Sequence, residues 1–293
     1  MNDGSSGSKP IAWIMLISIA LIWGTSFILI KKSLFVFSPG ELGALRITMA
    51  FLSLAPVAIS NLPKLPKAKL PVLFILGMNG SFFPAFLFAI AQTKLDSSIT
   101  GVINAITPIF VVIIGLIFFQ QKAKFINTVG IIIGFAGTTV LLLGASGFDL
   151  SRVNYYAFYV VLATVMYGTN INLIKRYMPN ISALNITAIS LFLTSPFCLV
   201  YLFGYSDFTN KMNAPGFWEA FSYVSILGIV GTAGALVLFN RLIQISSPLF
   251  ASSVTYLIPL VAIVWGVMDG EQINTYQFMG MGIVLGGVWL ANR

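Results

Sequence analysis

Long apolar segments separated by short polar ones run along the whole chain. They show no strict alternation of apolar and polar residues, which excludes the strands of a membrane β-barrel. A membrane-spanning helix needs about 20 predominantly apolar residues. Cutting the chain at charges, prolines and polar clusters gives ten such segments: 11–31, 40–60, 70–92, 98–119, 126–144, 154–174, 182–204, 218–239, 249–268 and 276–291. The pattern predicts an all-α integral membrane protein with ten transmembrane helices.

Composition supports a membrane protein and narrows its chemistry. Only 8% of the residues are charged, whereas soluble domains carry about a quarter, so this chain cannot cover a water-facing surface. The connecting segments are too short for a soluble catalytic domain. Cys198 is the one cysteine and there is no histidine, which excludes an internal disulfide, histidine catalysis and histidine-ligated metals. We therefore expect neither a metal nor a cofactor.

The net charge is +8. The lysine and arginine residues stand singly or in pairs between apolar segments, which is typical of membrane loops rather than of a nucleic-acid-binding face. Ten of these cations fall on one side of the membrane: Lys9, Lys64, Lys67, Lys69, Lys122, Lys124, Lys175, Arg176, Arg241 and Arg293. Five fall on the other: Lys31, Lys32, Lys94, Arg152 and Lys211. The positive-inside rule then predicts that both termini are cytoplasmic, after a disordered start over residues 1–10.

Two halves of the chain repeat each other at two sequence offsets. The first offset relates Trp23-Gly24-Thr25-Ser26 to Tyr167-Gly168-Thr169-Asn170. The second offset relates Ile75-Leu76-Gly77, with Gly80 and Phe88, to Ile226-Leu227-Gly228, with Gly231 and Phe239. Pro108 and Pro259 share that second offset. Each repeat, 11–144 and 154–291, holds five spans, so the second enters the membrane inverted, an arrangement typical of secondary transporters.

These residues give the chain a resemblance to the drug/metabolite transporter superfamily, specifically its EamA family. An aromatic-Gly-Thr start and a late Pro-centred helix in each five-span repeat carry the resemblance, which covers nearly the whole chain. It implies a ten-helix inverted-repeat permease in a bacterial inner membrane that exports or takes up small metabolites, amino acids among them. The family often has a glutamate after each Pro-centred helix. Glu271 fits that position, whereas the first repeat has Gln120.

Polar residues inside a membrane are usually paired or face a cavity. Thr100, Asn104 and Thr107 are spaced by four and three, so they share a helical face. Pro108 frees the carbonyl of Asn104, and Pro259 frees that of Thr255, close to Ser252. Further candidates for substrate binding are Trp23, Thr25, Ser26, Asn79, Phe83, Tyr167, Asn170 and Tyr256. Solute binding and ordinary helix packing both remain open for these residues.

Charges within or beside the spans also have two interpretations. Arg46 lies six residues inside the second span, where it would either bind a substrate carboxylate or extend to the lipid headgroups. Lys31 and Lys175 are at the C-terminal ends of their helices and Glu271 precedes the last span. These three either offset helix dipoles or act in gating.

The leading hypothesis is a secondary transporter that moves a small metabolite by alternating access, with export of an amino acid or a related amphipathic solute as the favoured case. The partners are then the solute and the lipid bilayer. The alternatives are an integral membrane enzyme or a non-transporting membrane scaffold or sensor. Glycines at helical spacing in the fifth and tenth spans predict close packing of these spans on each other or across a homodimer.

Overall fold

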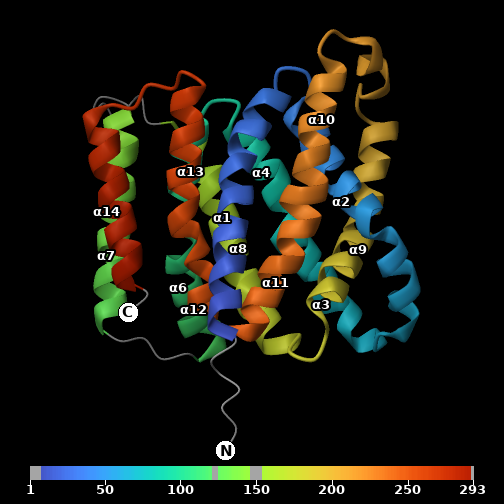
Figure 1. Cartoon of the computed structure of the whole chain (residues 1–293), viewed down its shortest axis with the longest axis horizontal. Coiled ribbons are helices and arrows are strands. Elements are labelled where there is room, and N and C mark those ends of the chain that lie inside the picture. The colour runs from blue at the N-terminus through green and yellow to red at the C-terminus, as the bar shows by residue number, and fades with distance from the viewer. Residues whose placement is uncertain (1–7, 121–124, 146–153, 292–293) are drawn as a thin grey trace, which may run out of the picture.

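The structure is a computed structural model that describes residues 8–120, 125–145 and 154–291, and these residues form helices and no strand (Figure 1). The first half contains α1 (Ser8–Ser33), α2 (Pro39–Asn61), α3 (Leu70–Gly77), α4 (Phe83–Ala91), α5 (Ser97–Asn104), α6 (Thr107–Phe119) and α7 (Phe125–Ala145). The second half contains α8 (Ala157–Tyr177), α9 (Ala183–Gly204), α10 (Phe217–Gly228), α11 (Ala235–Ile245), α12 (Pro248–Ser252), α13 (Val254–Met268) and α14 (Thr275–Ala291). Residues 8–10, assigned above to a disordered start, are helical; residues 1–7 lie outside the described part.

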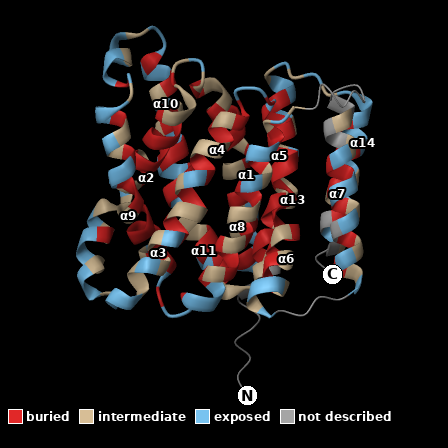
Figure 2. Cartoon of the chain, turned by 180° about the vertical axis from the view of Figure 1, so that it is seen from behind, coloured by how far each residue is buried: buried red, intermediate tan, exposed pale blue. Residues whose placement is uncertain are grey.

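Within the described residues, eight segments are long and apolar enough to cross a membrane. They are 10–33, 39–64, 67–91, 97–119, 157–177, 183–204, 217–245 and 250–268, and they coincide with eight of the ten spans expected from the sequence. The other two expected spans are α7 and α14. Buried residues lie along the inner faces of the helices, and exposed residues lie mainly on the outer faces and at the ends (Figure 2). The chain is therefore a multi-span helical membrane protein.

Four of the expected spans are not continuous α-helices. A π-helical turn, Met78–Phe82, joins α3 to α4, and a second, Ile229–Gly234, joins α10 to α11. The fourth span breaks between α5 and α6, where Pro108 lies in the first turn of α6, and the ninth breaks between α12 and α13. Pro259 lies inside α13 instead of at the break. Backbone irregularity inside a membrane is tolerated where protein covers it or where it lines a cavity.

Two close contacts between helices at glycine residues are equivalent under the sequence repeat: in each, a glycine of one half meets a residue of the other half. A side chain added at Gly24 of α1 would collide with Val261 of α13, and one at Gly168 of α8 with Phe110 of α6. The first offset of the sequence repeat relates Gly24 to Gly168, and the second relates Phe110 to Val261. The first helix of each half therefore packs on the late helix of the other half.

The α7–α14 pair lies at one end of the molecule, beyond α13 and α6 (Figure 1). A side chain at Gly137 of α7 would meet the backbone of Ile283 and Val284 in α14, and one at Gly287 would meet Gly134. These glycines let the two backbones touch, as small residues do in membrane helices. The prediction that the fifth and tenth spans pack on each other is confirmed, and the homodimer stays a prediction.

Substituting Gly287 with alanine should lower thermal stability, since the added methyl meets the Gly134 backbone and forces α7 and α14 apart, at a cost of about 1–3 kcal/mol. Gly286 is the matched control, because nothing lies within 4 Å of a side chain added there. Melting of the detergent-purified variants measures both effects. Equal melting temperatures for Gly286→Ala and Gly287→Ala would contradict this packing.

Candidate solute-binding site

A cavity of about 70 Å³ with apolar and polar walls lies between the two halves of the bundle, several times the space that one water molecule needs. Its walls come from α1, α2, α4, α5, α6, α8, α11, α13 and both π-helical turns. Seven residues predicted as substrate contacts line it: Trp23, Ser26, Asn104, Thr107, Tyr167, Asn170 and Thr255. The structure thus brings together predicted residues from both halves, and their binding of a solute remains a prediction.

The π-helical turn Ile229–Gly234 contributes Gly231 and Thr232 to the wall. Thr232 donates its hydroxyl proton to the carbonyl of Leu227, five residues back, at 2.9 Å. The Trp23 indole N–H donates to the carbonyl of Gly231 at 2.9 Å. Because a π turn widens the helix, it releases backbone groups that an α-helix would use internally, and such turns are frequent at functional sites.

Arg46 is the charged residue of the cavity lining. It is 8% exposed and its Nε donates to the Thr232 hydroxyl oxygen at 2.7 Å. No carboxylate among the described residues lies within ion-pair distance of its guanidinium. The interpretation that the Arg46 side chain extends to the lipid headgroups is therefore wrong, because this side chain is buried and forms a hydrogen bond with Thr232 inside the bundle. Among the described residues, this is the one hydrogen bond that the guanidinium makes, so its other N–H groups are available to an anion.

Aromatic rings form the apolar walls in two pairs that cross between the halves. Trp23 of α1 packs edge-on against Phe239 of α11, with ring centroids 4.9 Å apart. Tyr167 of α8 stacks on Phe88 of α4 at 6.1 Å. The first repeat offset relates Trp23 to Tyr167, and the second relates Phe88 to Phe239. The two pairs are therefore equivalent, with the halves exchanged. A small amphipathic solute would find one apolar face in each half of the protein.

At the breaks in the fourth and ninth spans, threonine hydroxyl groups donate hydrogen bonds to backbone carbonyls. Thr107 donates to the carbonyl of Asn104 at 2.7 Å, and Thr255 donates to that of Ser252 at 2.8 Å. The expectation of an unpaired Asn104 carbonyl is therefore wrong, because the hydroxyl next to Pro108 satisfies it. The Asn104 side chain itself lines the cavity.

Six predicted contacts do not line this cavity: Thr25, Asn79, Phe83, Thr100, Ser252 and Tyr256. Thr25 accepts a hydrogen bond from the Trp265 indole, and Thr100 is fully buried with its hydroxyl on the carbonyl of Asp96. Phe83 is 46% exposed. The π turn before Phe83 rotates the following helix, so counting along a regular helix assigns this residue to the wrong face.

Several lining residues were absent from the predicted site. They are Phe27, Ile30, Gly80, Ser81, Phe88, Ile171, Gly231, Thr232, Leu236 and Phe239. Four of them, Gly80, Phe88, Gly231 and Phe239, are anchors of the internal repeat. Membership of the repeat was therefore the available signal, since the first and third spans of each half both contribute to the cavity wall.

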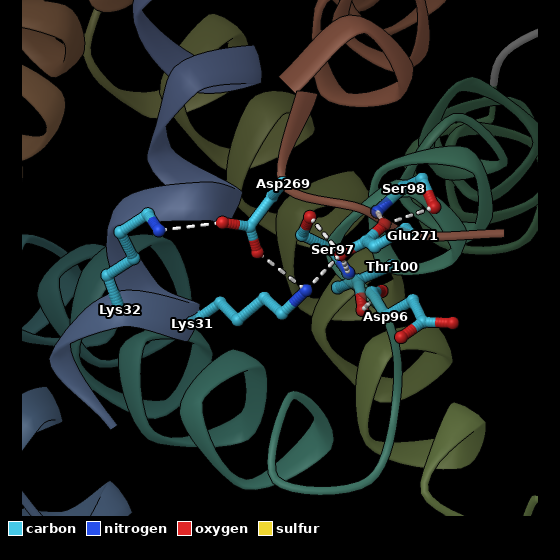
Figure 3. Close-up of polar contacts among 8 residues, drawn as sticks. All are labelled: Lys31, Lys32, Asp96, Ser97, Ser98, Thr100, Asp269 and Glu271. Atoms are coloured by element: carbon cyan, nitrogen blue, oxygen red, sulfur yellow. Dashed lines mark hydrogen bonds and ion pairs between the residues drawn. The ribbon is translucent and has the colours of Figure 1, made fainter. Parts of the chain in front are cut away.

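A network of charges joins three elements at one end of the bundle (Figure 3). Lys31 contacts Asp269 at 2.8 Å and Glu271 at 2.9 Å, and Lys32 contacts Asp269 at 2.6 Å. Glu271 also accepts four hydrogen bonds from the backbone and hydroxyl groups of Ser97 and Ser98 at the start of α5. Glu271 thus caps α5 and not α14, and it ties α5 to α1.

The contacts in this network keep Glu271 ionised. Burial alone raises the pKa of this carboxyl, but hydrogen bonds from Ser98, Ser97 and Lys31 outweigh burial and lower the pKa from 4.5 to about 2. Hydrogen bonds from Lys31 and Lys32 likewise lower the pKa of Asp269. The network is therefore ionic across the physiological pH range.

The equivalent lysine of the second half makes a different contact. Lys175, which the first repeat offset relates to Lys31, donates to the carbonyls of Ile243 and Ser246 at 3.1 and 2.7 Å. These carbonyls lie at the C-terminal end of α11, which a cation satisfies well. Lys175 thus joins α8 to α11 through neutral acceptors, whereas Lys31 binds carboxylates.

Both halves of the chain match one known sequence family. The sequence model of the EamA-like transporter family matches residues 10–143 and again residues 154–293. The chain belongs to the EamA family. An uncharacterized transporter of Archaeoglobus fulgidus is 27% identical, over 96% of this chain and 98% of its own length. The uncharacterized inner membrane transporter YedA of Escherichia coli K12 is 24% identical, over 94% of this chain and 88% of its own length.

Two further similarities bear on substrate and fold. A protein of Streptantibioticus cattleyicolor named a probable terminal-alkyne amino-acid exporter is 22% identical, over 96% of this chain and 93% of its own length. A crystal structure with 18% identity superposes with a TM-score of 0.67 over 96% of both chains. The second similarity shows the fold of this EamA member and nothing about its substrate.

Proposed function

We propose that this EamA member is a secondary carrier that moves a small metabolite through the membrane by alternating access. The observation that carries the proposal is the cavity itself: polar groups deep in a multi-span protein, enclosed by matching elements from both halves. Such groups are costly in a membrane unless they are paired or face a cavity, and in membrane proteins they often mark the path of a solute. A scaffold has no need of such a cavity.

The proposal includes ten spans arranged as two inverted repeats. It is supported by the separate match of the family model to each half and by the glycine contacts that recur with the halves exchanged. In this layout α7 and α14 are the fifth span of each repeat and pack at the periphery, away from the cavity. Two similar halves in opposite orientation can form equivalent inward-open and outward-open states.

Arg46 supports a solute with a carboxylate group. A buried guanidinium without an acidic partner is costly, and a carboxylate matches its planar N–H groups with two parallel hydrogen bonds. An amino acid or a related compound would bring this group into a cavity with aromatic walls. The similarity to a probable terminal-alkyne amino-acid exporter favours the same class of solute and favours export.

The two lysine contacts supply the gates in this mechanism. Lys31 directly follows Ile30, which lines the cavity, so the network with Glu271 lies just beyond the solute at one end. Lys175 occupies the corresponding place toward the other end. With cytoplasmic termini, Lys31 and Glu271 close the outer side and Lys175 closes the inner side.

Orientation is tested by labelling single cysteines in a Cys198→Ser background. Lys64 and Asn210 are exposed and lie in loops that the proposal places on opposite sides. A membrane-impermeant thiol reagent applied to intact cells should label Asn210→Cys and leave Lys64→Cys unlabelled until the cells are opened. Labelling of both residues from outside would contradict the inverted arrangement.

Transport is tested first by binding. The melting temperature of the purified protein should rise with concentration for at least one amino acid or related carboxylate, because a ligand of the folded state stabilises it by mass action. The same compound should then exchange across proteoliposomes that contain the protein and not across empty ones. Binding without any flux would favour a sensor over a carrier.

A further inference from the structure

A second, smaller polar pocket adjoins the cavity and has space for one water-sized group, about 10 Å³. The two share Gly80, Ser81, Asn170 and Leu236 in their walls, so they are direct neighbours. The small pocket extends toward α9 and reaches Ser190. We refer to it as the Ser190 pocket.

Three buried oxygen atoms in its wall have no hydrogen-bond partner: Asn170 Oδ1, Ser190 Oγ and Asn240 Oδ1. Their residues are 8%, 6% and 4% exposed. A buried polar atom without a partner costs about 1–3 kcal/mol, and most such atoms in folded proteins are paired. Three in one small pocket indicate that a hydrogen-bond donor from elsewhere completes it.

The orientation of the Asn240 amide follows from its neighbour. The Thr187 hydroxyl donates its proton to the carbonyl of Ala183 at 3.0 Å, so its oxygen is available only as an acceptor. Asn240 Nδ2 donates to this oxygen at 2.9 Å. The opposite amide orientation would set two acceptors against each other, so Asn240 Oδ1 is the unpaired atom of this side chain.

The repeat explains why the pocket is there. The first repeat offset relates Arg46 to Ser190, and the second relates Ser81 to Thr232. The correspondence holds in space, since a side chain at Gly228 would meet the carbonyl of Arg46 and one at Gly77 that of Ser190. In one half the long Arg46 side chain reaches Thr232. In the other half the Ser190 side chain is short, and the Ser190 pocket with its three unpaired oxygens lies beside it.

We propose that the Ser190 pocket binds a primary ammonium group of the transported solute, while Arg46 binds its carboxylate. The ammonium then occupies, in one half, the place that the guanidinium occupies in the other. An ammonium group is about the size of a water molecule and carries three donors, which match three unpaired oxygens. This inference rests on the proposed transport function and makes the solute a zwitterion.

The test uses compounds that differ only in their charged groups. They are leucine with isocaproate and isoamylamine, and alanine with propionate and ethylamine. Binding is measured from the melting temperature of the full-length purified protein. At least one amino acid should bind roughly tenfold or more tightly than the carboxylate that lacks its amino group, because hydrogen bonds to a charged group are strong.

Ser190→Ala should weaken amino-acid binding at least tenfold and leave the binding of the matching carboxylate unchanged. Its own folding should not suffer, since the substitution removes an unpaired buried hydroxyl. Ser195→Ala is the matched control: this buried serine also lies on α9, but its hydroxyl is paired with the carbonyl of Phe192. It should leave all affinities unchanged.

Each other outcome counts against a defined part of the inference. If the deaminated carboxylates bind as tightly as the amino acids, or Ser190→Ala changes nothing, the ammonium site is wrong while the Arg46 carboxylate site stands. If sodium chloride alone stabilises the wild type but not Ser190→Ala, the pocket binds an inorganic cation instead. If none of the six compounds binds, both the pocket and the proposed solute class are overturned.

Discussion

Replacing Arg46 with glutamine should reduce carboxylate-dependent transport by roughly 10- to 100-fold, the size expected for losing hydrogen bonds to a charged group. Arg46 is buried, lies in the cavity wall and has no acidic partner among the described residues. Lysine keeps the charge but cannot form two parallel hydrogen bonds. Arg46→Lys should therefore transport at an intermediate rate in proteoliposomes.

The stability of these variants separates a binding role from a structural one. If Arg46 serves the solute, Arg46→Gln removes an uncompensated buried charge and should melt no lower than the wild type without ligand. Arg176→Gln is the control, because Arg176 is exposed at the end of α8, and it should leave transport unchanged. A destabilised Arg46→Gln protein that still binds solute with wild-type affinity would contradict the assignment.

Replacing Glu271 with glutamine should weaken the closure that we propose for the outer side. The carboxylate contacts Lys31 and caps the start of α5 (Figure 3), and its side chain is 2% exposed. A pKa lowered from 4.5 to about 2 corresponds to roughly 3 kcal/mol of stabilisation of the ionised form. In Glu271→Gln, a cysteine placed at Ile30 should react faster with an impermeant thiol reagent from outside than it does in the wild-type background.

The contribution of Glu271 to the stability of the folded protein should decrease at low pH. Because its pKa is lower in the folded state, its stabilisation is complete above the ordinary carboxyl pKa of 4.5 and is lost as pH falls toward about 2. The difference in melting temperature between wild type and Glu271→Gln should be constant from about pH 8 to about pH 5 and shrink below that. A difference that changes near neutral pH would show that another group controls this contact.

The all-helical fold and its membrane spans could be predicted from the sequence because each span is a long apolar segment. An apolar segment of about 20 residues does not depend on distant contacts for its recognition. The repeat was equally accessible: the offset that relates Trp23 to Tyr167 also relates Gly24 to Gly168, whose contacts the structure shows with the halves exchanged. Roughly half of the predicted contact residues therefore came together in one cavity.

The remaining residues were misplaced for physical reasons. The π turns at Met78–Phe82 and Ile229–Gly234 have no clear signature in sequence, yet each rotates the helix that follows and determines whether a residue such as Phe83 faces the cavity. Long-range partners were equally inaccessible. The hydrogen bond from Arg46 to Thr232 spans 186 positions, and without it the burial of Arg46 could not be distinguished from contact with the headgroups.

The most direct test of alternating access is the reactivity of one cavity residue from both sides of the membrane. Leu236 lines both the cavity and the Ser190 pocket, and it becomes the only thiol in a Cys198→Ser, Leu236→Cys protein. An impermeant thiol reagent should label this residue when applied from either side, and a bound solute should slow both reactions. Labelling from one side only, unaffected by solute, would contradict a carrier with a central site.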